Sequence, residues 1–135
     1  MREILFRGKQ INSGEWTYGY YCPKPYSHFP CEATIFPSET IDRDWHGERV
    51  DPDTVGQFTG LTDRNGVKIF EGDIVRYGDT IHRVVFEQRN GTAYFGLVYA
   101  AYETLPFGYY QDLKQIEAIG NIYDNPELLE VNSDE

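Results

Sequence analysis

The feature that most constrains the fold is a series of short segments in which apolar and polar residues alternate, separated by turns that contain glycine. One such alternation begins at Ile4, and after a turn at Asn12-Ser13-Gly14 it resumes from Trp16 to Tyr20. A period of two places successive side chains on opposite faces of a strand, and a Gly-containing turn joins antiparallel neighbours. The first twenty residues therefore predict a β-hairpin.

Further alternating segments follow one another in the second half of the chain. They are residues 74–77, 81–87 and 92–99, separated by Gly78-Asp79 and Asn90-Gly91. Turns of this composition favour tight hairpins, and short strands at such spacing are typical of a small barrel. Because residues 116–122 predict one more strand, we expect a mainly β protein.

Other segments depart from this pattern. Residues 22–48 contain four prolines, so they allow at most a short edge strand at 34–36, because proline cannot donate to a strand ladder. Residues 109–115 are compatible with a helical turn or a loop. Near the end, Asp124-Asn125-Pro126 precedes a leucine pair and predicts a short helix, after which residues 131–135 are expected to fray.

Charge and composition argue against several classes of protein. Asp and Glu number 22 against 12 Lys and Arg, and the resulting net charge of -10 repels polyanions, so nucleic-acid binding is disfavoured. No run approaches the about 18 apolar residues of a membrane span, and charges near the N-terminus do not fit a signal peptide. Two cysteines are too few for a disulfide framework. We expect a soluble, cytoplasmic protein that has no membrane partner.

Two places in the sequence have residue types that bind metal ions. Cys22, His28 and Cys31 are zinc-ligand types, but a fourth ligand is missing locally unless His46 or a carboxylate supplies it, and the spacing fits no standard zinc module. The acidic turn 63–66 resembles a calcium loop only in composition, because its glycine stands at the fourth position instead of the sixth. Unligated thiols and a plain turn are favoured, and no cofactor is expected.

Acidic side chains are the main candidates for catalysis. Asp63, Glu71 and Asp73 would form an acid–base site if they converged at one end of the barrel. The simpler interpretation is that Glu71-Gly72-Asp73 is a turn whose aspartate bonds neighbouring amides. The sequence contains neither a nucleophile motif nor a phosphate-binding loop. An enzyme is therefore kept only as a third hypothesis, which requires a pocket holding at least two of Asp63, Glu71, Asp73 and His82.

Polar and aromatic residues give further candidates for binding. Gln57 and Thr59 lie between apolar positions of a short extended segment, so they either satisfy buried backbone groups, which we favour, or contact a ligand. Aromatic residues exceed what one small barrel buries. They are explained either by packing between two subdomains or by an interface with a partner or a second copy. This set comprises Trp16, Tyr18, Tyr20, Tyr21, Trp45, Tyr99, Tyr102, Phe107, Tyr109 and Tyr110.

Three blocks of the sequence resemble the YopX-like family, whose members are typically encoded by bacteriophages and prophages. Residues 50–61, with 63–66 and 69–75, resemble its central signature. Residues 7–20 resemble its start and 119–129 its end. The family has no established biochemical function, so the resemblance provides no catalytic residues. It implies a single domain over residues 1–135, with an N-terminal hairpin and irregular excursion (1–49), a signature segment and SH3-like barrel (50–130) and a tail (131–135).

Our first hypothesis is a phage- or prophage-derived, non-enzymatic protein-interaction module that binds a host or phage protein or forms a homo-oligomer. The alternative is a role related to nucleic acid. In one form a small barrel binds nucleic acid through a basic strip made of Arg76, His82, Arg83 and Arg89. In the other form the acidic surface mimics DNA.

Overall fold

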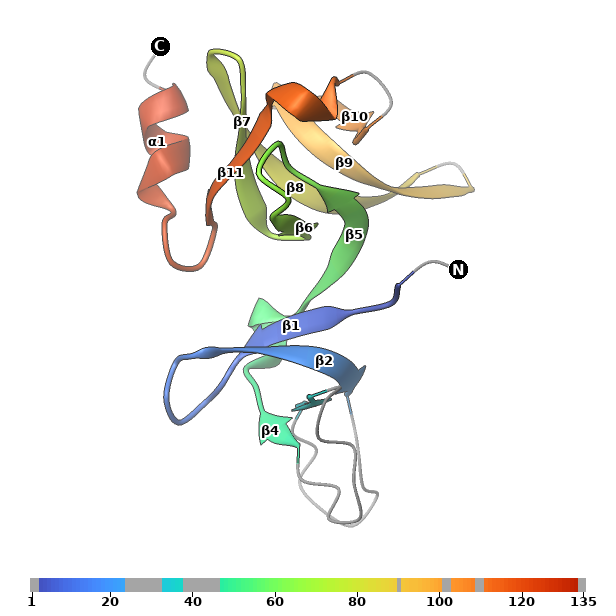
Figure 1. Ribbon diagram of the computed structural model, residues 1–135, viewed down its shortest axis with the longest axis vertical. Coiled ribbons are helices and arrows are strands. Elements are labelled where there is room, and N and C mark those ends of the chain that lie inside the picture. Colours follow the sequence, from blue (N-terminus) through green and yellow to red (C-terminus); the bar gives the residue numbers. More distant parts are fainter. Residues whose placement is uncertain are drawn as a thin grey trace. The chain divides into compact units, whose positions relative to one another are not determined.

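The structure is a computed structural model that describes residues 3–23, 33–37, 47–89, 91–100, 103–108 and 111–133 (Figure 1). It confirms a mainly β protein with one short C-terminal helix. The chain forms two compact units, residues 1–58 and 59–135, which are described one at a time. No helix within the described ranges is long and apolar enough to cross a membrane.

The first unit contains the predicted hairpin. Strands β1 (Phe6–Lys9) and β2 (Trp16–Cys22) pair antiparallel, with Lys9 opposite Trp16 and Arg7 opposite Tyr18. Strand β3 (Thr34–Phe36) pairs with β2, and β4 (Glu48–Arg49) pairs with β3. The prediction that 34–36 forms an edge strand is wrong, because β4 covers the side of β3 that faces away from β2.

A small core holds the first unit together. Ala33, Ile35 and Val50 are buried, and Tyr21 packs against them. Gly8 faces this core from β1, and a Cβ atom there would lie 3.0 Å from the Cβ of Val50, so only glycine lets the strand approach this closely.

The second unit begins within strand β5 (Gly56–Thr62), which also pairs with β1 through its first residues. Strand β6 (Lys68–Phe70) pairs with β5. A five-stranded sheet follows in the order β10-β9-β8-β7-β11. Its strands are β7 (Asp73–Tyr77), β8 (Thr80–Arg89), β9 (Thr92–Ala100), β10 (Glu103–Pro106) and β11 (Ile116–Asn121). The predicted meander is therefore confirmed, and β10 is an additional strand.

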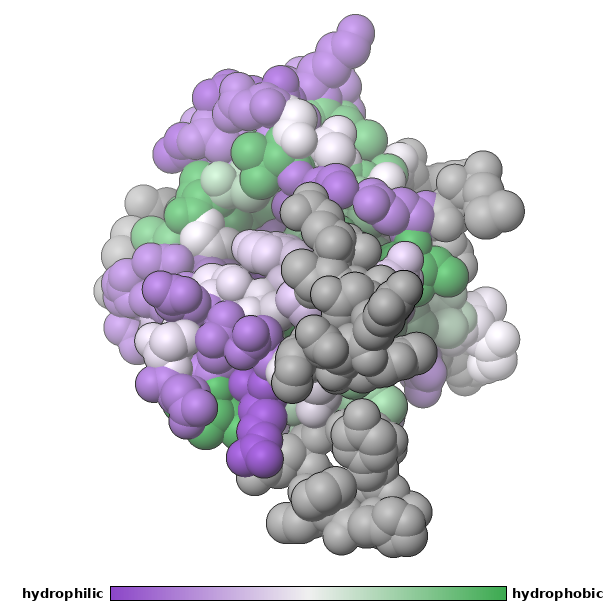
Figure 2. Space-filling view, turned by 60° about the horizontal axis from the view of Figure 1, so that its bottom comes forward, coloured by the Kyte–Doolittle hydropathy of each residue, from purple (hydrophilic) through white to green (hydrophobic). Residues whose placement is uncertain are grey.

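Among the described residues, the buried core of the second unit is larger than that of the first. Buried aliphatic and aromatic side chains from four of the five strands and two neighbouring segments meet in it: Ile69, Val75, Val84, Leu97, Phe107 and Ile116. At the surface, hydrophilic and hydrophobic residues are interspersed in the view of Figure 2.

Short helical segments complete the two units. A 3-10 turn (Pro52–Thr54) follows β4. A second 3-10 turn (Leu113–Gln115) lies at the end of residues 109–115, for which the sequence was compatible with a helical turn or a loop. Helix α1 (Glu127–Ser133) contacts β8 and extends into the segment that was expected to fray. Asn121 precedes the helix, and its side-chain oxygen accepts the N–H groups of Tyr123 and Asp124. This arrangement explains why a polar residue ends β11.

Candidate functional site

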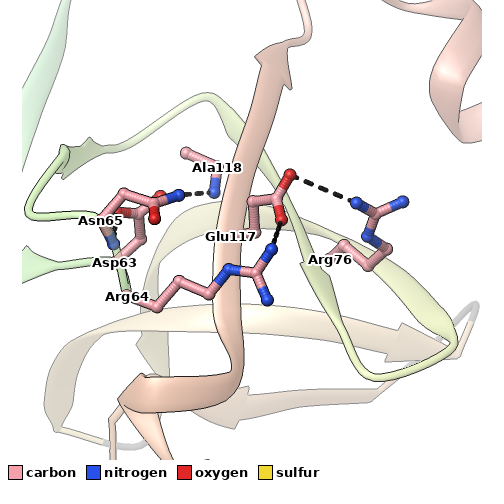
Figure 3. A network of polar contacts seen from close by, with 6 residues as sticks. All are labelled: Asp63, Arg64, Asn65, Arg76, Glu117 and Ala118. Atoms are coloured by element: carbon pink, nitrogen blue, oxygen red, sulfur yellow. Dashed lines mark hydrogen bonds and ion pairs between the residues drawn. The ribbon is translucent and has the colours of Figure 1, made fainter.

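Asp63, one of the polar residues singled out in the sequence, lies in the turn between β5 and β6 (Figure 3). Its side chain is only 6% exposed. One carboxylate oxygen accepts the N–H groups of Asn65 at 2.8 Å and Val67 at 2.9 Å, and the other accepts the N–H of Ala118 at 2.9 Å. Asp63 thus closes its own turn and fastens that turn to β11.

The environment of Asp63 also determines its charge state. Burial would raise the pKa of this carboxyl group, but the three backbone N–H donors and the nearby Arg64 charge outweigh that effect, so the pKa lies below its ordinary value. A carboxylate held in its ionised form by backbone amides suits a structural role better than that of a general acid.

Glu117 on β11 bonds two arginines beside this turn. It accepts from Arg64 on one side and from the Arg76 Nη2 atom, at 3.2 Å, on the other, as Figure 3 shows. The side chains of Arg64 and Arg76 are about half exposed, so the contribution of these ion pairs to stability is small. Arg76, a member of the predicted basic strip, is therefore already engaged by an acid.

The other carboxylate and polar candidates take separate places. Asp73 is buried and accepts the N–H of Phe70 at 2.7 Å, whereas Glu71 is half-buried in the same turn. The Thr59 hydroxyl donates to the Ile69 carbonyl at 2.8 Å and accepts the N–H of Leu61 at 3.2 Å. Gln57 is half-buried on β5 opposite Phe6, and Trp45 lies outside the described residues.

His82 lies inside the second unit with both ring nitrogens engaged. The side chain is 3% exposed, with Nδ1 3.0 Å from the Val98 carbonyl oxygen and Nε2 2.7 Å from the Thr80 hydroxyl. Its ring packs on Tyr99, whose hydroxyl accepts from Gln111 at 2.9 Å. These contacts place His82 in the interior and remove it from the predicted basic strip. Arg83 is exposed on the same strand, and the side chain of Arg89 lies outside the described part of the chain.

In the part of the chain that the structure describes, no three His, Cys, Asp or Glu side chains gather as metal ligands would. Cys22 has a free thiol, while His28, Cys31 and His46 fall outside the described ranges. An open depression of about 400 Å³ lies at the β1–β2 turn of the first unit, and none of the predicted carboxylates lines it.

A different set of residues shares one face of the first unit's sheet. Because residues two apart on a strand, and residues paired across strands, lie on the same face, the register defines this set without ambiguity. We call it the aromatic face. It consists of Arg7, Lys9, Trp16, Tyr18, Tyr20, Cys22, Thr34, Phe36, Arg49 and Gly56.

On β2 two large side chains of this face are exposed and the small residues between them are buried, whereas large apolar side chains are usually the buried ones. Tyr18 and Tyr20 are 46% and 50% exposed, whereas the small residues between and beside them, Thr17 and Gly19, are buried. Trp16 is half-buried, and two cations lie over it. The Arg7 guanidinium carbon is 4.6 Å from the centre of a Trp16 ring, and the Lys9 Nζ atom is 5.7 Å from it. Such cation–π contacts hold the cations and the ring in one layer.

Comparison with known proteins assigns the chain to a family. The family model described as YopX protein matches residues 5–130. The chain belongs to the YopX protein family. The matched range includes every strand and most of α1, so the signature blocks of this YopX-family protein fall on the elements described above.

A solved structure is similar to this YopX-family protein over almost its full length. Protein EF1440 from Enterococcus faecalis, known from a crystal structure, is 23% identical with a TM-score of 0.52, and the alignment covers 96% of this chain and 99% of that chain. At this identity the likeness concerns the fold alone. No curated protein matches the sequence.

The signature residues and the aromatic face differ in what they contact. Asp63, Asp73 and Asn121 direct their oxygens to backbone N–H groups, so they stabilise turns. The aromatic face directs Tyr18 and Tyr20 to solvent. These tyrosines are among the excess aromatic residues of the sequence, whereas Arg7 and Lys9 were not predicted as candidates. A turn centred near residue 12 would have placed both cations beside the aromatic residues, because it pairs Lys9 with Trp16 and Arg7 with Tyr18.

Proposed function

We propose that this protein is a phage- or prophage-derived, non-enzymatic module that binds another protein in the bacterial cytoplasm through the aromatic face of its first unit. The observation that carries the proposal is the outward orientation of Tyr18 and Tyr20 above the Arg7–Trp16 layer. The second unit, an SH3-like barrel in this proposal, serves as scaffold.

The chemistry of the face supports protein binding. Trp, Tyr and Arg are the residue types that contribute most binding energy at protein interfaces, because each combines a large contact area with a polar group. The aromatic face places a half-buried Trp, two exposed Tyr and the buried Arg7 on adjacent strands. Packing of Arg7 and Lys9 on Trp16 holds them in place before a partner arrives, which lowers the entropy lost on binding.

The polar candidates support the same choice indirectly. Asp63, Asp73 and His82 each engage backbone groups of the second unit, which explains their presence without a substrate. The rings of Tyr18 and Tyr20 are about half exposed on β2, and exposed tyrosine is a residue type that protein interfaces use.

The test is affinity capture from bacterial lysate, with and without phage infection, at physiological salt. The variant Tyr18→Thr/Tyr20→Thr removes both exposed rings and keeps a residue type that favours strands. The matched control is Phe86→Thr, which removes a 41% exposed ring from the second unit. We expect a protein that binds the wild type and the control but not the double variant. The proposal would be refuted if the double variant kept that protein, or if only nucleic acid were recovered. If the wild type recovers a second copy of itself and the double variant does not, the partner is a second copy.

A further inference from the structure

We infer that the open depression at the β1–β2 turn of the first unit takes a long cationic side chain, lysine or arginine, from the protein that binds the aromatic face. This inference rests on the proposed function and names the chemistry of the partner. It follows from the lining of the depression, from the acids at its rim and from its position beside the aromatic face.

Apolar residues from two distant segments meet in the depression. Its volume is about 400 Å³, and Ile11, Gly14 and Pro52 contribute to its lining. Ile11 is 53% exposed, and Pro52 is exposed as well. The aliphatic stem of a lysine or arginine packs on apolar surface of this kind while its charged end remains near water or an acid.

Hydrogen bonds fix the segments that line the depression. The Gln10 side-chain amide donates to the Thr17 hydroxyl at 2.6 Å, which ties β1 to β2. The Thr54 hydroxyl donates to the Asp51 carbonyl at 2.7 Å and accepts the N–H of Lys9 at 2.9 Å, which ties the 3-10 turn to β1. A site that is formed before its ligand arrives loses less entropy on binding.

The charges at the rim favour a cation. Asp51 lines the depression, and the exposed acids Asp53 and Glu15 lie next in the chain to other lining residues. One Asp51 carboxylate oxygen accepts the N–H of Asp53 at 3.0 Å, and the structure shows no donor to the other oxygen among the described residues. An exposed carboxylate of this kind bonds an ammonium or guanidinium group. The net charge of -10 adds a long-range attraction for a basic partner.

Lys9 connects the depression with the aromatic face. Its backbone carbonyl accepts the N–H of Asp51 at 2.9 Å, and the residue belongs to the lining. Its ammonium group, however, lies 5.7 Å from the centre of the Trp16 ring, on the aromatic face. The two surfaces therefore share one residue, so a partner that covers the aromatic face reaches the depression with a neighbouring side chain.

The first test uses the full-length, isotope-labelled protein and three peptides with blocked ends. Each has the sequence Ser-Gly-X-Gly-Ser, where X is lysine, glutamate or norleucine, which keeps the aliphatic stem but lacks the charge. We expect the lysine peptide to shift the amide signals of Ile11, Gly14 and Asp51, to bind about fivefold more tightly than the norleucine peptide, and to weaken about threefold between about 0.05 M and about 0.5 M salt. Equal binding of these two peptides, tighter binding of the glutamate peptide, or shifts confined to other residues overturns the inference.

A conservative variant tests the acid. Asp51→Asn removes the charge but keeps the oxygen that caps the 3-10 turn, because asparagine caps as well as aspartate. It should weaken binding of the lysine peptide about threefold and leave the norleucine peptide unaffected. The matched control is Asp112→Asn, which makes the same change at the cap of the 3-10 turn in the second unit and should have no effect. Unchanged binding of the lysine peptide by Asp51→Asn refutes the inference.

A second variant tests the apolar wall. Ile11→Ser should weaken the lysine and norleucine peptides alike, by about threefold, because the stem loses apolar contact. Val67→Ser removes a 50% exposed apolar side chain from the second unit and serves as its control. An equal effect of the two variants would contradict binding in the depression.

Capture of the partner separates this inference from the proposed function. If the captured protein is lost by Tyr18→Thr/Tyr20→Thr and is bound more weakly by Asp51→Asn, both are supported. If it is lost by the tyrosine variant but is unaffected by Asp51→Asn and Ile11→Ser, the proposed function stands and the cationic side chain is refuted. If the tyrosine variant keeps the partner, the proposed function itself fails, whatever the peptides show.

Discussion

At the scale of the residue, Asp63 shows how one carboxylate joins elements that are far apart in the sequence. Its two oxygens accept three backbone N–H groups, one of them from Ala118 on β11. In Asp63→Asn an amide group would replace one acceptor oxygen and would leave a buried N–H without a partner. We expect a loss of about 3 kcal/mol in the free energy of unfolding. Urea unfolding measures this loss, and Asp79→Asn, in an exposed turn, should change stability by less than about 0.5 kcal/mol.

The same residue makes stability depend on pH. Because the folded-state pKa of Asp63 lies below its ordinary value of 3.8, the ionised carboxylate stabilises the folded state above that pH. The stabilisation is lost as the pH falls below 3.8 and through the folded-state pKa. We therefore expect the stability difference between wild type and Asp63→Asn to be constant near neutral pH and to shrink in strong acid. Urea midpoints of both proteins across this range provide the measurement, and a difference that does not shrink would contradict the argument.

At the scale of the element, the sequence predicts strands well where alternation and turn residues agree. The segments at Trp16–Cys22 and Thr92–Ala100 have both signals, and both are strands. Strand β10 (Glu103–Pro106) has neither, because it is short and ends in proline, and it forms by pairing with β9. The edge position expected for β3 was wrong for a related reason: β4 contains only two residues and leaves no periodic signal. Tertiary pairing thus determines the strands that local pattern does not.

Pairing of β10 depends on Gly96 in β9. A Cβ atom at this position would lie 2.5 Å from the Thr104 Cγ2 atom and 3.0 Å from the Leu105 carbonyl oxygen. We expect Gly96→Ala to lower the free energy of unfolding by about 1 to 3 kcal/mol through overpacking. Thr104→Ser removes the Cγ2 atom, so the combined variant should recover part of the loss. Urea unfolding of the four proteins forms a double-mutant cycle, and strictly additive effects would show that the two side chains do not meet.

The candidate site could be predicted only in part for the same reason. The alternation Trp16, Tyr18, Tyr20 is visible in the sequence and places the rings on one face. The opposing cations join them only through the register of the hairpin, because a shift by one residue would move Arg7 and Lys9 to the core face. Gly8 helps to fix this register, since it is the β1 residue that can approach Val50.

At the scale of the whole molecule, the two units have cores of unequal size. Among the residues that the structure describes, three buried residues, Ala33, Ile35 and Val50, form the core of the first unit, whereas six form that of the second. Stability grows with the apolar surface that a unit buries, and a unit of about sixty residues is marginal without further support. The unit that bears the aromatic face should therefore be the less stable one, and a partner bound there should stabilise it by mass action.

The distribution of tryptophan makes this difference measurable. Both tryptophans, Trp16 and Trp45, belong to residues 1–58, so their fluorescence reports the first unit, whereas far-UV circular dichroism is dominated by the larger second unit. We expect the fluorescence transition at a lower urea concentration than the main dichroism transition. Asp63→Asn, which affects the second unit, should move the dichroism transition toward lower urea and leave the fluorescence transition nearly in place. Coincident transitions that move together would show instead that the two cores unfold as one cooperative structure, in which case binding at the aromatic face would stabilise the entire chain.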